Sequence, residues 1–132
     1  MEKSHKLGNL QLAIMRVLWE ESEATAVDVH AALYAARRLA PTTIATMLRK
    51  MEEKGVVAHR TAGRRFIYRS TVTEEEVKRS MVSELMERLF EGDASELVSH
   101  LLAEGEIDRA ELDRLRERIS ARERKAESSN GR

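Results

Sequence analysis

The segment from Leu39 to Val57, LAPTTIATMLRKMEEKGVV, carries side chains that can bind a polyanion. Hydrophobic residues at helical spacing predict one buried face, formed by Ile44, Met47, Leu48 and Met51. The opposite face has hydroxyl groups on its first turns and cations further along, at Thr42, Thr46, Arg49 and Lys50. No carboxylate precedes Glu52 on this helix. Hydroxyls followed by cations, with the acids kept to the end, predict contact with phosphates.

Double-stranded DNA is the partner that this order of side chains fits. In helix-turn-helix proteins the later helix enters the major groove, and residues near its N-terminus contact base edges. Threonine can hydrogen-bond a base or a phosphate, and its methyl group can touch a thymine methyl. The helix N-terminus itself favours phosphate. For Arg49 and Lys50 alone, an ordinary solvated face is the simpler explanation, so the prediction depends on the hairpin that follows.

The chain after this helix predicts a β-hairpin with a basic tip. Val56–Thr61 and Phe66–Val72 are rich in β-branched and aromatic residues, and Gly63 lies in the turn between them. An isolated hairpin is marginal in water, so we expect it to pack on the helices through Val57, Phe66 and Tyr68. Its basic residues are predicted to contact phosphates, which position a protein without specifying sequence. The candidate DNA-binding residues are Pro41, Thr42, Thr43, Thr46, Arg49, Lys50, Arg60, Arg64, Arg65 and Tyr68.

Three helices are expected before the hairpin. The first carries a hydrophobic stripe at Leu7, Leu10, Ile14, Val17 and Leu18, which Trp19 extends. Thr25 and Asp28 have the spacing of a capping box and predict the start of a second helix, which ends near Arg37–Arg38. Pro41 in its first turn and Gly55 just past its end delimit the third helix, 41–54.

The second half of the chain predicts helices only. Capping pairs at Thr73/Glu76, Asp93/Glu96 and Asp108/Glu111 precede three hydrophobic runs. The first of these helices has a stripe two residues wide, more apolar surface than two short helices can cover. A second copy of the chain is the favoured cover, and packing on the N-terminal domain is the alternative. The candidate dimer-interface residues are Val77, Met81, Val82, Leu85, Met86, Leu89, Leu97, Leu101, Leu112 and Leu115.

These elements predict a mainly α protein with a small β-hairpin in three regions. Residues 1–72 form a winged helix-turn-helix DNA-binding domain, 73–121 a helical dimerisation domain, and 122–132 a polar tail that is either a frayed helix end or disordered. Charge follows this division. Residues 1–72 hold 12 basic and 7 acidic residues, whereas residues 73–132 hold 11 and 16. A basic first half and an acidic second half suggest an anion-binding module joined to another function.

Composition argues against catalysis and metal binding. The chain has 132 residues and no cysteine, which excludes disulfides and thiolate chemistry. No phosphate-binding glycine loop or nucleophile elbow is present. The histidines lack metal-ligand spacing; they are His5, His30, His59 and His100. We predict no enzyme activity, metal or cofactor. With no signal peptide and no membrane-length apolar run, a cytoplasmic protein is expected.

Three motifs resemble a known family. LGNLQLAIMRVLWE, APTTIATMLRKMEEKG and HRTAGRRFIYRS, in this order and spacing, resemble the BlaI/MecI/CopY family of bacterial transcriptional repressors. The resemblance covers roughly Leu7 to Ile119 and is strongest over the first 72 residues. It implies a winged helix-turn-helix domain and a helical dimerisation domain, in a homodimer that binds inverted repeats over promoters and blocks transcription. Many members control penicillinase or methicillin-resistance genes.

The resemblance also implies roles for single residues. The recognition helix falls on Pro41 to Lys54, with DNA contacts at Thr42, Thr43, Thr46 and Arg49 and the wing at Arg64 and Arg65. Ala40 stands where some members have a serine cap, and Ala45 where some have a basic residue, so an operator sequence does not transfer. In β-lactam-responsive members a sensor-linked protease system leads to cleavage of an Asn–Phe bond; the matching place here is His100–Leu101. Copper sensing through C-terminal cysteines is excluded.

Two other function classes stay open at this point. A winged-helix protein-interaction module would carry an apolar outer face on its third helix, whereas this face is polar and basic. A ligand-gated DNA-binding regulator would need a pocket between the two domains, and the sequence does not show one. A thermal-shift screen would detect such a ligand, because a ligand that binds only the folded state raises the melting temperature.

Overall fold

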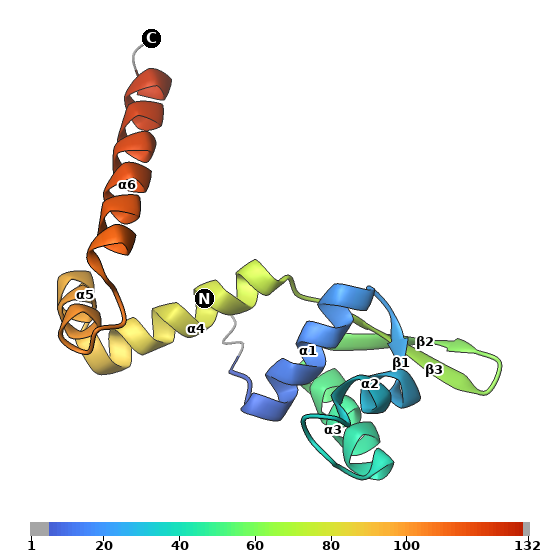
Figure 1. Cartoon of the computed structure of the whole chain (residues 1–132). Helices are drawn as coiled ribbons and strands as arrows, with labels where there is room; N and C mark the ends of the chain where they lie inside the picture. The colour runs from blue at the N-terminus through green and yellow to red at the C-terminus, as the bar shows by residue number, and fades with distance from the viewer. Residues whose placement is uncertain (1–5, 131–132) are drawn as a thin grey trace. The chain divides into compact units, whose positions relative to one another are not determined.

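The computed structural model describes residues 6–130, and the chain forms two compact units, Met1–Glu84 and Leu85–Arg132. The mainly α class with a small sheet is confirmed (Figure 1). His5 and the last two residues of the predicted tail lie outside the described residues. The elements in chain order are α1 (Asn9–Glu21), β1 (Ala24–Thr25), α2 (Ala26–Leu33), α3 (Pro41–Lys54), β2 (Val57–Ala62), β3 (Arg65–Ser70), α4 (Glu74–Phe90), α5 (Ala94–Ala103) and α6 (Arg109–Asn130).

The first unit is built on a hydrophobic core shared by α1, α2 and α3. Its fully buried side chains include Ile14 and Leu18 of α1, Val29 of α2, and Leu48 and Met51 of α3. The predicted helical stripes are therefore the core faces. Trp19 also ties α1 to the end of the sheet, because its indole Nε1 donates to Ser70 Oγ at 3.1 Å and to the Val72 carbonyl at 2.9 Å.

Helix α3 begins and ends at the predicted residues. Pro41 occupies its first turn, and the preceding Ala40 offers no side-chain hydrogen bond as a cap. Gly55 follows its last residue with a φ of 85°, the left-handed conformation that glycine adopts without a Cβ penalty. His30 of α2 holds the preceding loop, since its Nε2 lies 2.8 Å from the Leu39 carbonyl and must donate to it. The loop before α3 and the glycine after it therefore define both ends of the helix.

The sheet has one strand more than the sequence predicted. The β2–β3 hairpin is confirmed, and β3 also pairs on its other side with β1, in the order β1-β3-β2. Val57 and Tyr68 are buried as predicted. The prediction for Phe66 was wrong, because 48% of this side chain is exposed. Helix α2 also ends at Leu33, earlier than predicted, with a turn following it.

The capping box at the start of α2 is confirmed in both directions. The Asp28 N–H donates to Thr25 Oγ1 at 3.1 Å, and the Thr25 N–H donates to Asp28 Oδ2 at 3.0 Å. The hydrogen bond from the Thr25 backbone N–H is the main reason why the pKa of Asp28 lies below its ordinary value of 3.8, and interaction with the Thr25 side chain is the second reason. The box therefore stabilises the fold above the unfolded-state pKa of Asp28, and this contribution is lost as the pH falls through the folded-state pKa.

Thr25→Ala is expected to lower the free energy of unfolding by about 1 kcal/mol at neutral pH, the usual loss for a removed N-cap hydroxyl. Urea denaturation followed by circular dichroism measures this. The difference from the wild type should shrink below pH 3.8, because the protonated Asp28 is a weaker partner. Thr25→Ser keeps the hydroxyl and serves as the control. Equal stability of the Ala and Ser variants would show that the Thr25 hydroxyl contributes nothing.

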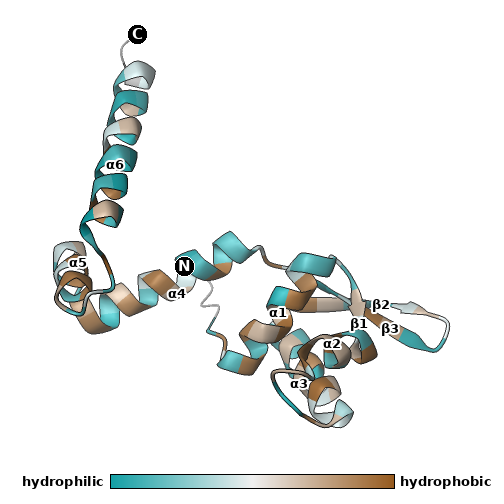
Figure 2. Ribbon diagram, in the orientation of Figure 1, coloured by the Kyte–Doolittle hydropathy of each residue, from teal (hydrophilic) through white to brown (hydrophobic). Residues whose placement is uncertain are grey.

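The three helices after the hairpin start at the predicted caps. Thr73 Oγ1 accepts from the Glu76 N–H at 3.0 Å, and the Asp93 and Asp108 carboxylates accept from Glu96 and Glu111 N–H groups at 3.2 and 2.8 Å. Helix α6 runs to Asn130, so residues 122–130 of the predicted tail are helical. Hydrophobic residues mark α4 and α5, whereas α6 is largely hydrophilic (Figure 2).

The apolar stripe of α4 has two parts with different surroundings. Val77 is 2% exposed and belongs to the core of the first unit, and Met81 packs against that core. Val77 is therefore not available to a partner chain, and its assignment to the dimer interface was wrong. Further along α4, Val82, Leu85 and Leu89 are exposed. Packing on the N-terminal domain therefore accounts for the first part of the stripe, whereas cover of the exposed part by a second copy of the chain stays a prediction.

Candidate nucleic-acid interface

The outward face of α3 is fully accessible. Its first turn is uncapped by any side chain; Pro41 has no N–H there, and the Thr43 N–H donates to the Ala40 carbonyl at 3.0 Å. Neither Arg49 nor Lys50 forms an ion pair with another described residue. Exposed side chains run along this face in the predicted order: Pro41, Thr42, Thr43, Thr46, Arg49 and Lys50. The face offers donors and positive charge, and its two cations need not leave an ion pair with any described residue in order to bind an anion.

The hairpin supplies a second basic surface. Gly63, with a φ of 64°, forms the turn, and Arg64 and Arg65 beside it are exposed. Arg60 is exposed too, but its Nε lies 2.8 Å from Glu23 Oε2. With more than 40% of both side chains exposed, such a pair is weak and can be exchanged for a phosphate.

Tyr68 does not fit the surface role that its sequence position suggested. Only 7% of the residue is exposed. Burial raises the pKa of its phenol, and the Glu52 carboxylate adds to this rise whereas Arg49 opposes it. Its ring is part of the core that supports the hairpin, which argues against a contact with a DNA phosphate.

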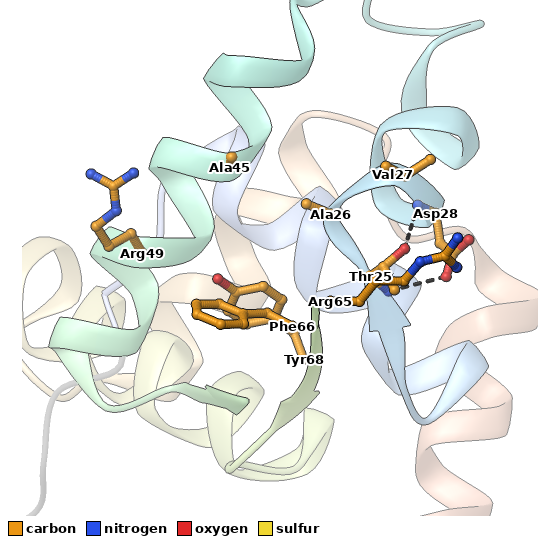
Figure 3. Close-up of a pocket in the computed structure, with 9 residues that line it drawn as sticks. All are labelled: Thr25, Ala26, Val27, Asp28, Ala45, Arg49, Arg65, Phe66 and Tyr68. Atoms are coloured by element: carbon orange, nitrogen blue, oxygen red, sulfur yellow. Dashed lines mark hydrogen bonds between the residues drawn. The ribbon is translucent and has the colours of Figure 1, made fainter. Parts of the chain in front are cut away.

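A hollow connects α3 with the sheet (Figure 3). Ala45 and Arg49 of α3 border it on one side and the first turn of α2 on the other, while Phe66 and Tyr68 place their rings in it from β3. In Figure 3 the Arg65 side chain extends toward Asp28. The residues that line the hollow are Thr25, Ala26, Val27, Asp28, Ala45, Arg49, Arg65, Phe66 and Tyr68. It places two predicted DNA contacts, Arg49 and Arg65, at the border of one surface.

One polar contact beside this hollow was not predicted. His59 Nδ1 of β2 lies 2.7 Å from Oε1 and 2.8 Å from Oε2 of Glu52, in the last turn of α3. The His59 ring stacks on Phe66, with ring centres 4.1 Å apart. Neither residue has a spacing in the sequence that would indicate the pair, because a turn and a strand register bring them together.

Comparison with known proteins identifies the family. The family model for the penicillinase repressor matches residues 7–121. This chain belongs to the penicillinase repressor family. The predicted resemblance is thereby confirmed, and the protein is a DNA-binding transcriptional repressor, as its relatives are.

Individual members of the penicillinase repressor family support this placement. The penicillinase repressor of Bacillus licheniformis is 25% identical over 115 residues, which cover 87% of this chain and 90% of that protein. The transcriptional regulator BlaI of Mycobacterium tuberculosis (strain CDC 1551 / Oshkosh) is 43% identical over 58 residues, 43% of this chain and 42% of that protein.

Two solved structures match more than half of this family member. The solution structure of the DNA-binding domain of the repressor BlaI is 30% identical with a TM-score of 0.51, and the match covers 58% of this chain and 93% of that one. Monomeric Bacillus licheniformis BlaI in complex with the blaP half-operator matches with the same identity and coverage and a TM-score of 0.50. The winged helix-turn-helix fold is confirmed. Among the described residues no helix is long and apolar enough to cross a membrane.

Proposed function

We propose that this repressor works in the cytoplasm as a homodimer that binds an inverted-repeat operator and blocks transcription. Each protomer inserts the N-terminal part of α3 into the major groove of one half-site and lays the β2–β3 hairpin along the phosphate backbone. The half-site centres are then one helical turn of DNA apart, or a multiple of it. Bacillus licheniformis BlaI was solved as a monomer in complex with a half-operator. This supports one half-site for each protomer.

The observation that carries the proposal is the accessible face of α3. Hydroxyls at Thr42 and Thr46 precede the cations of Arg49 and Lys50, and all four side chains are exposed. In the major groove this order places threonines at base edges and cations toward phosphates. The basic hairpin adds a second contact surface beside the same helix. In this proposal residues 1–72 carry the DNA contacts.

Dimerisation is proposed to use the second unit and the adjoining part of α4. Several large hydrophobic side chains remain exposed in the single chain: Val82, Leu85, Leu89, Leu102, Leu115 and Ile119. Such side chains repeated along helices are typical of surfaces that another protein covers. The seam therefore lies within residues 73–121, and α4 belongs in part to both units.

Release of the repressor is proposed to involve the second unit as well. His100 and Leu101, at the position of the cleavage site in β-lactam-responsive relatives, lie within α5. A sensor-linked protease would need α5 to open locally before it reached this bond, because the backbone is hydrogen-bonded in a helix. The sequence at this bond is His–Leu and not Asn–Phe, so a protease that cleaves here would have a different sequence specificity from that of the β-lactam-responsive systems.

Selection of random duplex DNA by the purified protein, at roughly physiological salt, tests the proposed function. Enrichment of an inverted repeat is the expected result. A search for this repeat upstream of genes would then identify the regulated genes. If a folded, dimeric protein enriched no sequence, the basic face would be non-specific or merely solvated. A protein-interaction role would then replace the proposal.

A further inference from the structure

A carboxylate–imidazole pair joins the recognition helix to the wing. Glu52 of α3 and His59 of β2 are half-buried, with 34% and 26% of their side chains exposed, and their polar atoms are 2.7 Å apart. Phe66 stacks on the imidazole with planes 16° apart, and the Tyr68 ring lies 5.6 Å away. The imidazole is therefore held in one orientation by a carboxylate and two aromatic rings.

The pair lies between the two proposed DNA-contacting surfaces. Glu52 follows Arg49 by three residues, which places the two side chains at neighbouring positions on the helix surface. His59 directly precedes Arg60, and its strand pairs with β3, which begins at Arg65. A lone carboxylate at this place would repel DNA phosphates. A protonated His59 would cancel that charge.

We propose that Glu52 and His59 are positioning residues that couple DNA binding to protonation. When His59 is charged, the pair is neutral and holds the hairpin on α3; when His59 is neutral, the Glu52 charge remains and opposes the phosphates. DNA therefore favours the protonated pair, and binding takes up a proton. The inference rests on the proposed function, since it needs α3 and the hairpin to contact DNA together.

The surroundings of His59 leave few other groups to titrate. Strand β2 packs against α3 and β3. The facing titratable groups are Glu52 from α3 and the phenol of Tyr68 from β3, and Arg49 lies close enough to Tyr68 to affect its pKa. Burial raises the pKa of Tyr68 above its ordinary value of 10.0, so the phenol keeps its proton throughout the range in which histidine ordinarily changes charge, about pH 5 to 8.

The affinity of the full-length protein for DNA, measured between about pH 5 and 8 at constant salt, tests the coupling. The probes are a mixed-sequence duplex of about 30 base pairs, three helical turns, and the repeat obtained by selection. The wild type is expected to bind roughly three- to tenfold more tightly at the acid end, the effect of about one added phosphate contact. Absence of DNA binding at every pH would refute the proposed function itself. Binding that is independent of pH would refute only the coupling.

Two variants separate this role from a purely structural one. His59→Gln cannot take up the proton, so it should lose the pH dependence and keep the weaker affinity of the wild type near pH 8. Glu52→Gln keeps an oxygen that can accept from the imidazole but removes the charge, so it should bind more tightly than the wild type near pH 8. His100→Gln is the matched control, because His100 is exposed on α5 of the second unit, and it should retain the wild-type profile.

A pH dependence that survives in His59→Gln would place the titrating group elsewhere. Weaker binding by Glu52→Gln at every pH would show that the pair acts only as a structural contact. Circular dichroism checks the fold of each variant, and if His59→Gln does not fold, the comparison of Glu52→Gln with the wild type still decides the question.

Discussion

Arg49→Ala is expected to weaken binding to the selected inverted repeat by roughly 1–3 kcal/mol at each half-site, provided that its guanidinium contacts a base. This corresponds to about a 5- to 150-fold loss in affinity for each protomer. Arg49 is exposed on α3 and gives up no described ion pair when it binds DNA. For the same reason its removal should leave the melting temperature almost unchanged, and the loss can be read as a loss of contact.

Binding to the selected repeat and to a mixed-sequence duplex shows what Arg49 recognises. If Arg49 reads a base, the Arg49→Ala variant should discriminate less between the selected repeat and the mixed-sequence duplex than the wild type does. Lys50→Ala, a phosphate contact in this proposal, should weaken both equally and reduce the salt dependence by about one unit for each contact. Arg79→Ala changes the net charge equally on exposed α4 and is the control. An unchanged operator affinity in Arg49→Ala would remove this residue from the interface.

The sequence predicted best the features that are set by neighbouring residues. The limits of α3 follow from Pro41 and Gly55, because proline suits the first turn and glycine the left-handed residue after the last. The starts of α2, α4, α5 and α6 follow from capping residues that bond an N–H three positions later. These bonds are local, so no knowledge of the fold is needed to expect them.

The features that the sequence did not predict depend on distant parts of the chain. Strand β1 has two residues and exists because it pairs with β3, which lies more than 40 residues further along. Phe66 and Tyr68 lie two residues apart in the same strand and so face the same side of it, yet Tyr68 is buried and Phe66 is half-exposed, since the helices cover only part of the sheet. The Glu52–His59 pair likewise arises from the approach of α3 to β2.

The C-terminal end of the chain shows a different limit. We expected a frayed or disordered tail after residue 121 because no large hydrophobic residue follows Ile119. Helix α6 continues there because Arg, Glu, Lys and Ala are strong helix formers even without a core to pack against. Hydrophobic periodicity predicts where a helix is buried, whereas intrinsic propensity sets how far it extends into solvent.

Leu85→Asp is expected to convert the proposed homodimer into monomers at micromolar concentration. Leu85 is 40% exposed on α4, with Leu89 one turn further along at 70%, so an aspartate is tolerated in the free chain but buried and unpaired in the seam. A buried charge without a partner costs several kcal/mol. Size-exclusion chromatography with light scattering measures the mass. Ser83→Asp adds the same charge at an exposed position of the same helix and should remain dimeric.

Loss of the dimer should also be visible in DNA binding, and only on the full operator. Two linked half-site contacts bind about 10²- to 10⁴-fold more tightly than one, because the second contact forms within the complex. Leu85→Asp should therefore lose affinity for the inverted repeat by this factor and keep the wild-type affinity for an isolated half-site, since Leu85 lies outside the unit that carries α3 and the hairpin. A variant that stays dimeric would place the seam elsewhere, and a variant that also loses the half-site would show that α4 supports the DNA-binding fold.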